Sequence, residues 1–120
     1  MAESILAMKS LDFGIRIVRC AQYLQNEKSE YIMSKQVLRS GTSIGANIHE
    51  GLYAQSKADF VSKLTISLKE ASETSYWLIL LNKTEYLTQE IYESLKLDVD
   101  ELIRMIIASL KTTKSNEKNS

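Results

Sequence analysis

The side chains that could carry chemistry in this sequence are few. The single histidine, His49, is followed by Glu50, and two more glutamates, Glu70 and Glu73, lie further along the chain. Helical bundles hold two-metal carboxylate sites with two Glu-x-x-His pairs, but the residue three positions before His49 is Ala46, so not even one such pair is present. No nucleophile motif surrounds the histidine either. A metal-dependent enzyme is therefore only the alternative hypothesis, and we expect no catalytic residue, no cofactor and no metal.

A glycine-rich stretch, RSGTSIGANIHEG at residues Arg39–Gly51, could in principle cradle a phosphate, because it holds three of the four glycines. Neither the G-x-G-x-x-G nor the G-x-x-x-x-G-K-[ST] pattern is present in it. On a helix, a row that is apolar apart from one glycine forms at spacings of 4, 3 and 4: Val37, Gly41, Ile44 and Ile48. Small residues at Gly41 and Gly45 let another helix approach closely, which offsets about 1 kcal/mol of lost helix propensity per glycine. We therefore predict a tightly packed helix here.

A second row on the same helix is polar but mostly small, and consists of Gln36, Ser40, Ser43, Asn47 and Glu50. Such a row is too polar for a core, and a free surface normally carries longer charged side chains. A neighbouring subunit would explain both properties, so we predict an oligomer interface. The residues predicted for this interface and for helix packing are Ser40, Gly41, Ser43, Gly45, Asn47 and Glu50.

The stretch LKEASETSYWLILL, residues 68–81, places Glu70 and Glu73 on one side of the next helix. If the chain turns near residues 53–56, Arg39 lies level with Glu70 and Gln36 lies level with Glu73. A charged pair between helices is better explained by setting the helix register than by catalysis. We therefore interpret Arg39, Glu70 and Glu73 as register-setting polar residues.

The spacing of apolar residues predicts four helices. In the first, we read Met8, Leu11, Ile15 and Val18 as one row and Phe13, Ile17, Ala21 and Leu24 as a second, adjacent row, which together make an apolar face wider than one partner helix needs. A polar connector is expected at residues 25–30, and the second helix is expected to begin near residues 32–34. Ser56, with Asp59 three residues on, predicts the start of the third helix, and Thr88 predicts the start of the fourth.

Short connectors between long helices favour an antiparallel up-down-up-down four-helix bundle, so the predicted fold class is all-α. The sequence contains no proline to interrupt such helices. We expect the bundle to span residues 1–110. Residues 111–120 are polar, and we expect them to form a disordered C-terminal tail.

Lysine plus arginine equals aspartate plus glutamate at 15 each, so the net charge is zero. A nucleic-acid-binding protein usually carries a basic excess. The lone Cys20 lies in a helical pattern and is expected to be a buried thiol. No signal peptide and no uncharged apolar stretch long enough to span a membrane are visible, so a cytoplasmic location is expected. Binding to a membrane surface is not favoured, because a bundle core explains the apolar rows.

The glycine-rich stretch and the segment SKADFVSKLTISLKEASETSYWLILL together strongly resemble the bacterial four-helix bundle protein family, also called the 23S ribosomal RNA intervening-sequence proteins. The resemblance covers residues 5–110. It implies an antiparallel four-helix bundle that assembles into a ring-like homopentamer. It also implies similarity to the accessory variability determinant proteins of diversity-generating retroelements, which are basic pentamers that bind nucleic acid and a reverse transcriptase.

The function expected from these observations is that of a non-enzymatic oligomeric scaffold whose partners are further copies of itself and RNA, DNA or a nucleoprotein. No membrane partner is expected. The candidate nucleic-acid contacts are Arg16, Arg19, Lys35, Arg39, Lys57 and Lys63, together with the tail residues Lys111, Lys114 and Lys118. For each of them, an ordinary solvated side chain or a salt bridge is the competing interpretation.

Overall fold

The computed structural model describes the backbone of residues 2–119 and the side chains of residues 5–115. Four α-helices make up this part of the chain, and it contains no strand: α1 (Ala2–Lys28), α2 (Met33–Leu52), α3 (Lys57–Lys83) and α4 (Gln89–Asn119). The absence of proline allows helices of this length to run without a kink. The all-α, four-helix prediction is confirmed.

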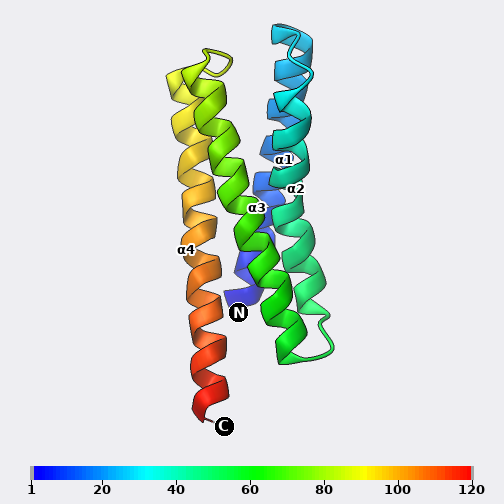
Figure 1. Cartoon of the computed structure of the whole chain (residues 1–120), viewed down its shortest axis with the longest axis vertical. Helices are drawn as coiled ribbons and strands as arrows, with labels where there is room; N and C mark the ends of the chain where they lie inside the picture. The colour runs from blue at the N-terminus through cyan, green and yellow to red at the C-terminus, as the bar shows by residue number, and fades with distance from the viewer. Residues whose placement is uncertain (1, 120) are drawn as a thin grey trace.

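The helices pack in a closed order, in which α2 contacts α1 and α3, and α4 contacts α3 and α1. Consecutive helices run in opposite directions along the long axis, as Figure 1 shows, because each is joined to the next by a short loop. The structure measures 52 × 22 × 20 Å along its principal axes. In this order α1 and α3 lie at diagonal corners and run in the same direction.

Side chains at the helix starts satisfy backbone N–H groups that have no partner within the helix. The Ser56 hydroxyl accepts a hydrogen bond from the Asp59 N–H at 3.1 Å. The Thr88 hydroxyl accepts one from the Ile91 N–H at 3.2 Å. The sequence therefore predicted both of these helix starts correctly.

The α1–α2 connection differs from the expected connector. Helix α1 continues to Lys28, and the turn passes through Ser29, which has a positive φ of 52°. The carboxylate of Glu30, only 7% exposed, then accepts hydrogen bonds from three successive N–H groups at the start of α2, those of residues 32, 33 and 34. A glutamate before the helix thus takes the capping role that Ser, Thr, Asp or Asn usually fills.

The core lies along the bundle axis and is formed by one row from each helix. Its buried apolar side chains include Phe13, Ile17, Leu24, Val37, Ile44, Ile48, Leu64, Leu78, Leu81, Val99, Leu102 and Ile106. The row predicted from Phe13 to Leu24 is buried throughout, as is the row from Val37 to Ile48.

The other predicted row of α1 does not join the core. Met8, Leu11, Ile15 and Val18 are 66, 65, 50 and 38% exposed. This row lies on the opposite side of α1 from Phe13 and Ile17, so the expectation of one wide face made of adjacent rows is wrong. Helix α1 is apolar on two opposite sides, and only one of them is covered.

Helix α4 continues to Asn119, through the polar residues from 111 onwards. The disorder expected for this segment stays a prediction. The segment holds no proline or glycine that would stop the helix.

Candidate functional site

The glycine-rich stretch lies inside α2, where its glycines allow α1 and α3 to come close. A Cβ atom built on Gly41 would lie 2.8 Å from both Cγ atoms of Ile17 in α1. At Gly45 it would lie 3.2 Å from the carbonyl oxygen of Ser10. Gly51 is buried near the end of α2, where a Cβ would lie 3.2 Å from the Cδ1 atom of Leu64. Helix packing, rather than phosphate binding, therefore accounts for these glycines.

Hydroxyl groups join α2 to α3 of the same chain at two levels, and one of them belongs to the small polar row. Ser40 is fully buried, and its hydroxyl accepts a hydrogen bond from the Thr74 hydroxyl at 2.9 Å. The buried Ser67 hydroxyl donates to the Ile44 carbonyl at 2.9 Å. Ser40 therefore serves the contact between two helices of one chain, whereas the sequence analysis placed it against a neighbouring subunit.

The remaining polar residues of that row are less buried. Ser43 and Asn47 are half-buried, and each donates to a carbonyl one turn earlier in α2, at 2.6 and 2.8 Å. Glu50 is exposed and forms an ion pair with Lys63 of α3 at 3.3 Å. The interface assigned to these three residues stays a prediction.

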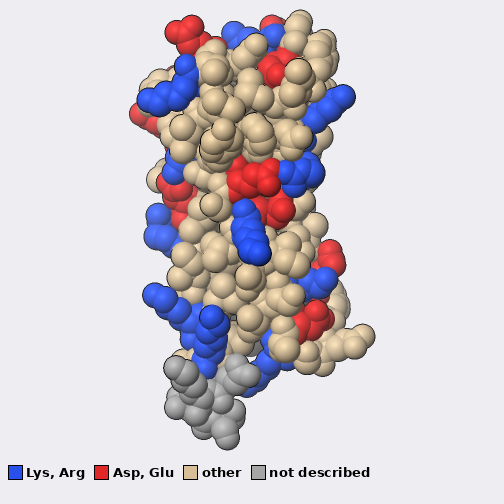
Figure 2. Space-filling model, in the orientation of Figure 1, with Lys and Arg blue, Asp and Glu red and all other residues tan. Residues whose placement is uncertain are grey.

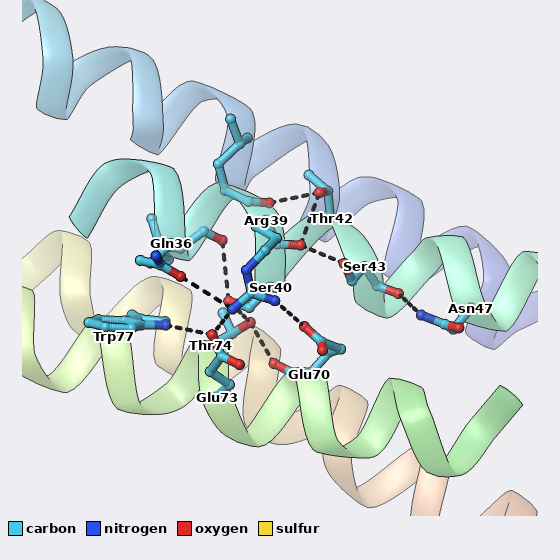
Figure 3. A network of polar contacts seen from close by, with 12 residues as sticks. Gln36, Arg39, Ser40, Thr42, Ser43, Asn47, Glu70, Glu73, Thr74 and Trp77 are labelled. Carbon is cyan, nitrogen blue, oxygen red and sulfur yellow. Dashed lines mark hydrogen bonds and ion pairs between the residues drawn. The ribbon is translucent and has the colours of Figure 1, made fainter. Parts of the chain in front are cut away.

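A polar network centred on Arg39 joins α2 to α3 (Figure 3). The Arg39 guanidinium donates to the Glu70 carboxylate at 3.2 Å and to the Glu73 carboxylate. The same Glu73 oxygen accepts a hydrogen bond from the indole Nε1–H of Trp77 at 2.9 Å. The predicted pairing of Arg39 with Glu70 is confirmed, while Gln36 accepts from Arg39 at 3.4 Å instead of contacting Glu73.

This network holds α2 and α3 in a fixed position relative to each other. Each carboxylate is held by a cation or an indole N–H, and the Arg39 side chain is about half exposed. Charge-assisted hydrogen bonds of this kind fix the geometry between two helices. The register-setting role fits the contacts, although its energetic worth is modest where the charges meet solvent.

The four residues weighed as metal ligands are not brought together around a common point. His49 lies edge-on to Tyr53, with ring centroids 5.5 Å apart. Glu70 and Glu73 belong to the Arg39 network, several helical turns from His49. Within the residues described, no three His, Cys, Asp or Glu side chains form a group that could hold a metal ion.

An open groove of ≈ 630 Å³ runs between α1 and α2 beside the exposed row of α1. Met8, Leu11, Ile15 and Val18 line it, and small residues of both helices, Gly14 and Gly45 among them, line its remainder. A Cβ placed on Gly14 would meet no atom within 4 Å. This strongly apolar surface is the feature that the sequence analysis assigned to the core.

The predicted basic contacts divide into two sets. Arg16 pairs with Asp98 at 2.6 Å, Arg39 pairs with Glu70 and Glu73, and Lys63 pairs with Glu50. Considering only side chains 5–115, the other three, Arg19, Lys35 and Lys57, form no ion pair. Lys35 and Lys57 lie at the starts of α2 and α3, at opposite ends of the bundle. The structure thus does not gather these three into one patch.

The surface charge agrees with that dispersal. Figure 2 shows acidic and basic side chains interspersed over the face in view, with basic side chains more frequent towards the lower end, where α4 ends. The candidates Lys111 and Lys114 are exposed near that end of α4, and Lys118 lies outside the described side chains. None of the helices in the described chain is long and apolar enough to cross a membrane.

Cys20 is 7% exposed. Burial raises the pKa of its thiol from 9.0 to about 11, although the Arg16 charge acts in the opposite direction. The thiolate is the reactive form of cysteine, so this thiol is in its unreactive, protonated form at neutral pH.

Comparison with known proteins places the fold in a family. The family model of the 23S rRNA-intervening sequence protein matches residues 2–108. The chain is also similar to a crystal structure of a protein of unknown function from the S23 ribosomal protein family of Bacteroides thetaiotaomicron VPI-5482, with 54% identity and a TM-score of 0.91, covering 92% of this chain and 99% of the other. A comparison with curated proteins gives no match. The chain belongs to the 23S rRNA-intervening sequence protein family.

Proposed function

We propose that this protein is a non-enzymatic helical-bundle scaffold that assembles with copies of itself through the outer face of α1. The observation that carries the proposal is the second apolar side of α1. Four residues of that side, Met8, Leu11, Ile15 and Val18, are each at least 38% exposed, and they extend over about 15 Å of helix. An apolar stripe on a helix ordinarily packs against another element that covers it. We therefore infer that another molecule covers this face.

A further copy of the chain is the occupant that we propose. The net charge is zero, so copies that approach one another meet no long-range repulsion. The antiparallel up-down-up-down arrangement gives each helix one face towards the core and one towards the outside, and the outer face of α1 is apolar from Met8 to Val18. We propose the ring-like homopentamer that the family resemblance implies as the form of the assembly.

The non-enzymatic part of the proposal is supported by the contacts of the glutamates. Glu70 and Glu73 are bonded to Arg39, and Glu73 also accepts the hydrogen bond of Trp77. Hydrogen bonds within the chain therefore occupy the carboxylate oxygens that would otherwise bind a substrate or metal. These contacts suit residues that hold two helices together.

Contact with RNA, DNA or a nucleoprotein is a second candidate function. It is supported by Arg19, Lys35 and Lys57, which form no ion pair with the described side chains, and by the basic end of the bundle in Figure 2. In one copy these residues are scattered. Several copies in one ring would present them repeatedly, and linked weak sites gain affinity through effective concentration.

The experiment is to measure the solution mass by light scattering, at low and high salt, with and without RNA. Self-assembly predicts a mass near five times 13.6 kDa for the wild type that persists at high salt. The variant Leu11→Gln should lose this mass, whereas Leu97→Gln, which alters a residue on α4 that is similarly exposed, at 68%, should retain it. A monomeric wild type would refute the scaffold. A mass increase with RNA that is lost at high salt would support the second function.

A further inference from the structure

The outer face of α3 carries exposed apolar side chains among polar ones. Ile66, Tyr76 and Ile79 are 40, 57 and 39% exposed, and the exposed Lys69 lies among them. Helices α1 and α3 occupy diagonal corners of the bundle, so their outer faces point away from each other. One copy therefore offers two different faces, an apolar one on α1 and a mixed one on α3. Two different faces in contact form a heterologous, head-to-tail interface, which closes into a ring when the rotation between copies allows it.

The position of α3 along the bundle axis, relative to α1, can be found at two points from the contacts that both helices make with α2. At the first, Ser10 of α1 lies against Gly45 of α2. The neighbouring Ile44 accepts a hydrogen bond from Ser67 of α3 at 2.9 Å. Ser10 is therefore level with Ser67, which is 57 positions later in the chain.

The second point lies two helical turns further along α1. Ile17 packs against Gly41 of α2, with 2.8 Å between its Cγ atoms and the position of a Cβ. The adjacent Ser40 is bonded to Thr74 of α3 at 2.9 Å. Ile17 is therefore level with Thr74, which is again 57 positions later. The two helices run in the same direction, so this offset holds along the length that they share (Figure 1).

Resting on the self-assembly proposed above, we propose that the outer face of α1 in one copy docks on the outer face of α3 in the next copy, side by side and at the same height. The offset then places Asp12 opposite Lys69 and Arg19 opposite Tyr76. Rotation about an axis parallel to the helices keeps equivalent residues level, as a closed ring requires.

The charges at these positions are complementary. Asp12 and Lys69 are exposed, have opposite charge and form no ion pair inside the described part of the chain. Arg19 is also exposed, and its one hydrogen bond is a 3.4 Å contact to Gln22 of its own helix. A guanidinium over the face of a tyrosine ring is an attractive cation–π arrangement. The charged residues beside the α1 row therefore match residues on the outer face of α3 at this one offset.

A two-fold contact of α1 with α1 of another copy fits less well. The exposed row of α1 from Met8 to Val18 has its centre at the height of residue 13, so an antiparallel pairing about that centre brings the two Asp12 carboxylates close together. Like charges opposed across an interface are costly. Such a pairing would also leave Tyr76 and its apolar neighbours on α3 exposed to water.

Charge reversal tests the docking. Asp12→Lys opposes Lys69 with a like charge, and Lys69→Glu opposes Asp12 with a like charge, whereas the double variant restores opposite charges. We expect each single variant to raise the concentration at which the assembly dissociates by about tenfold and the double variant to return it towards the wild-type value. Lys35→Glu, which reverses an exposed unpaired charge on α2, is the matched control and should leave it unchanged. Circular dichroism checks that every variant is folded.

The outcomes separate the two proposals. A monomeric wild type refutes self-assembly and the docking with it. An assembled wild type that Lys69→Glu does not weaken refutes the docking alone. An assembly that Asp12→Lys weakens but the double variant does not restore also refutes it, because residue 12 then faces something other than residue 69.

Disulfide trapping gives an independent measurement. In chains carrying Cys20→Ala, the single cysteine of Asp12→Cys should crosslink to that of Lys69→Cys when the two proteins are mixed under oxidation. A disulfide needs Cα atoms within about 7 Å, so an efficient crosslink would show that residues 12 and 69 of neighbouring copies face each other. A crosslink between two Asp12→Cys chains, with none between an Asp12→Cys chain and a Lys69→Cys chain, would overturn the docking in favour of the two-fold contact.

Discussion

Replacement of Gly41 by alanine tests how closely α1 and α2 pack. The new Cβ would lie 2.8 Å from both Cγ atoms of Ile17. That side chain is fully buried and branched at Cβ, so it has little freedom to move aside. Overpacking a core costs about 1–3 kcal/mol, while alanine gains about 1 kcal/mol of helix propensity over glycine. We therefore expect a net loss of about 1 kcal/mol in the free energy of unfolding.

A double-mutant cycle makes the expected sign unambiguous. Ile17→Ala removes the two Cγ atoms that the new Cβ would strike, although it costs about 2–5 kcal/mol by itself. In that background Gly41→Ala should become stabilising by up to about 1 kcal/mol of helix propensity, because the one remaining contact, at 3.2 Å to the Cβ of residue 17, can relax into the space that the Cγ atoms leave. The coupling free energy between the two substitutions then measures the cost of the steric contact between residues 17 and 41.

The assay is urea unfolding followed by circular dichroism at one protein concentration, since assembly makes stability depend on concentration. Gly14→Ala is the matched control. Its Cβ would enter open space within the single chain, so it should not destabilise the fold. If Gly41→Ala stabilises the wild type, or if its effect is the same in both backgrounds, the close-packing account of the glycine-rich stretch is wrong.

Three further perturbations have distinct readouts. Glu30→Ala removes the acceptor of three backbone N–H groups at the start of α2, so thermal unfolding should show a loss of about 1–2 kcal/mol, whereas Glu27→Ala, an exposed site on α1, should be nearly neutral. Glu73→Ala leaves the Trp77 indole N–H without its acceptor, so the tryptophan emission should shift in the folded protein; an unchanged spectrum would contradict the contact. The folded Cys20 thiol has a pKa of about 11 against 9.0 ordinarily, so its stabilising contribution is complete below pH 9 and is lost as pH rises towards 11. Wild type should therefore lose more stability than Cys20→Ala across that window, by up to about 2–3 kcal/mol, and equal losses would show that the thiol is not buried when folded.

Features that depend on local geometry could be predicted from the sequence. Ser56 and Thr88 were recognised as caps because a short hydroxyl side chain reaches the N–H three residues on whatever the rest of the fold does. The pairing of Arg39 with Glu70 followed from the position of the loop alone, since two antiparallel helices joined by a short loop have a fixed register.

Two features needed the tertiary structure. Glu30 caps α2 because the turn at Ser29, with its positive φ, brings a carboxylate back over the helix start, and glutamate has no general preference for that role. Ser40 was assigned to another subunit because small polar residues suit any close helix contact. Its partner, Thr74, is also small and polar, so the two hydroxyl groups satisfy each other inside the bundle.

The outer face of α1 shows why periodicity alone cannot assign a surface. Its residues recur at spacings of 3 and 4, and this pattern is the same whether a row packs on its own core or on another molecule. The sequence did show that the two rows of α1 lie on different sides of the helix. Ile15 and Ile17 are two residues apart, so they lie about 200° apart around a helix, on opposite sides. A helix at the corner of a four-helix bundle has only one side towards the core. Two opposite apolar rows on such a helix fit the self-assembly that we propose, in which one row packs inside the chain and the other packs on a further copy.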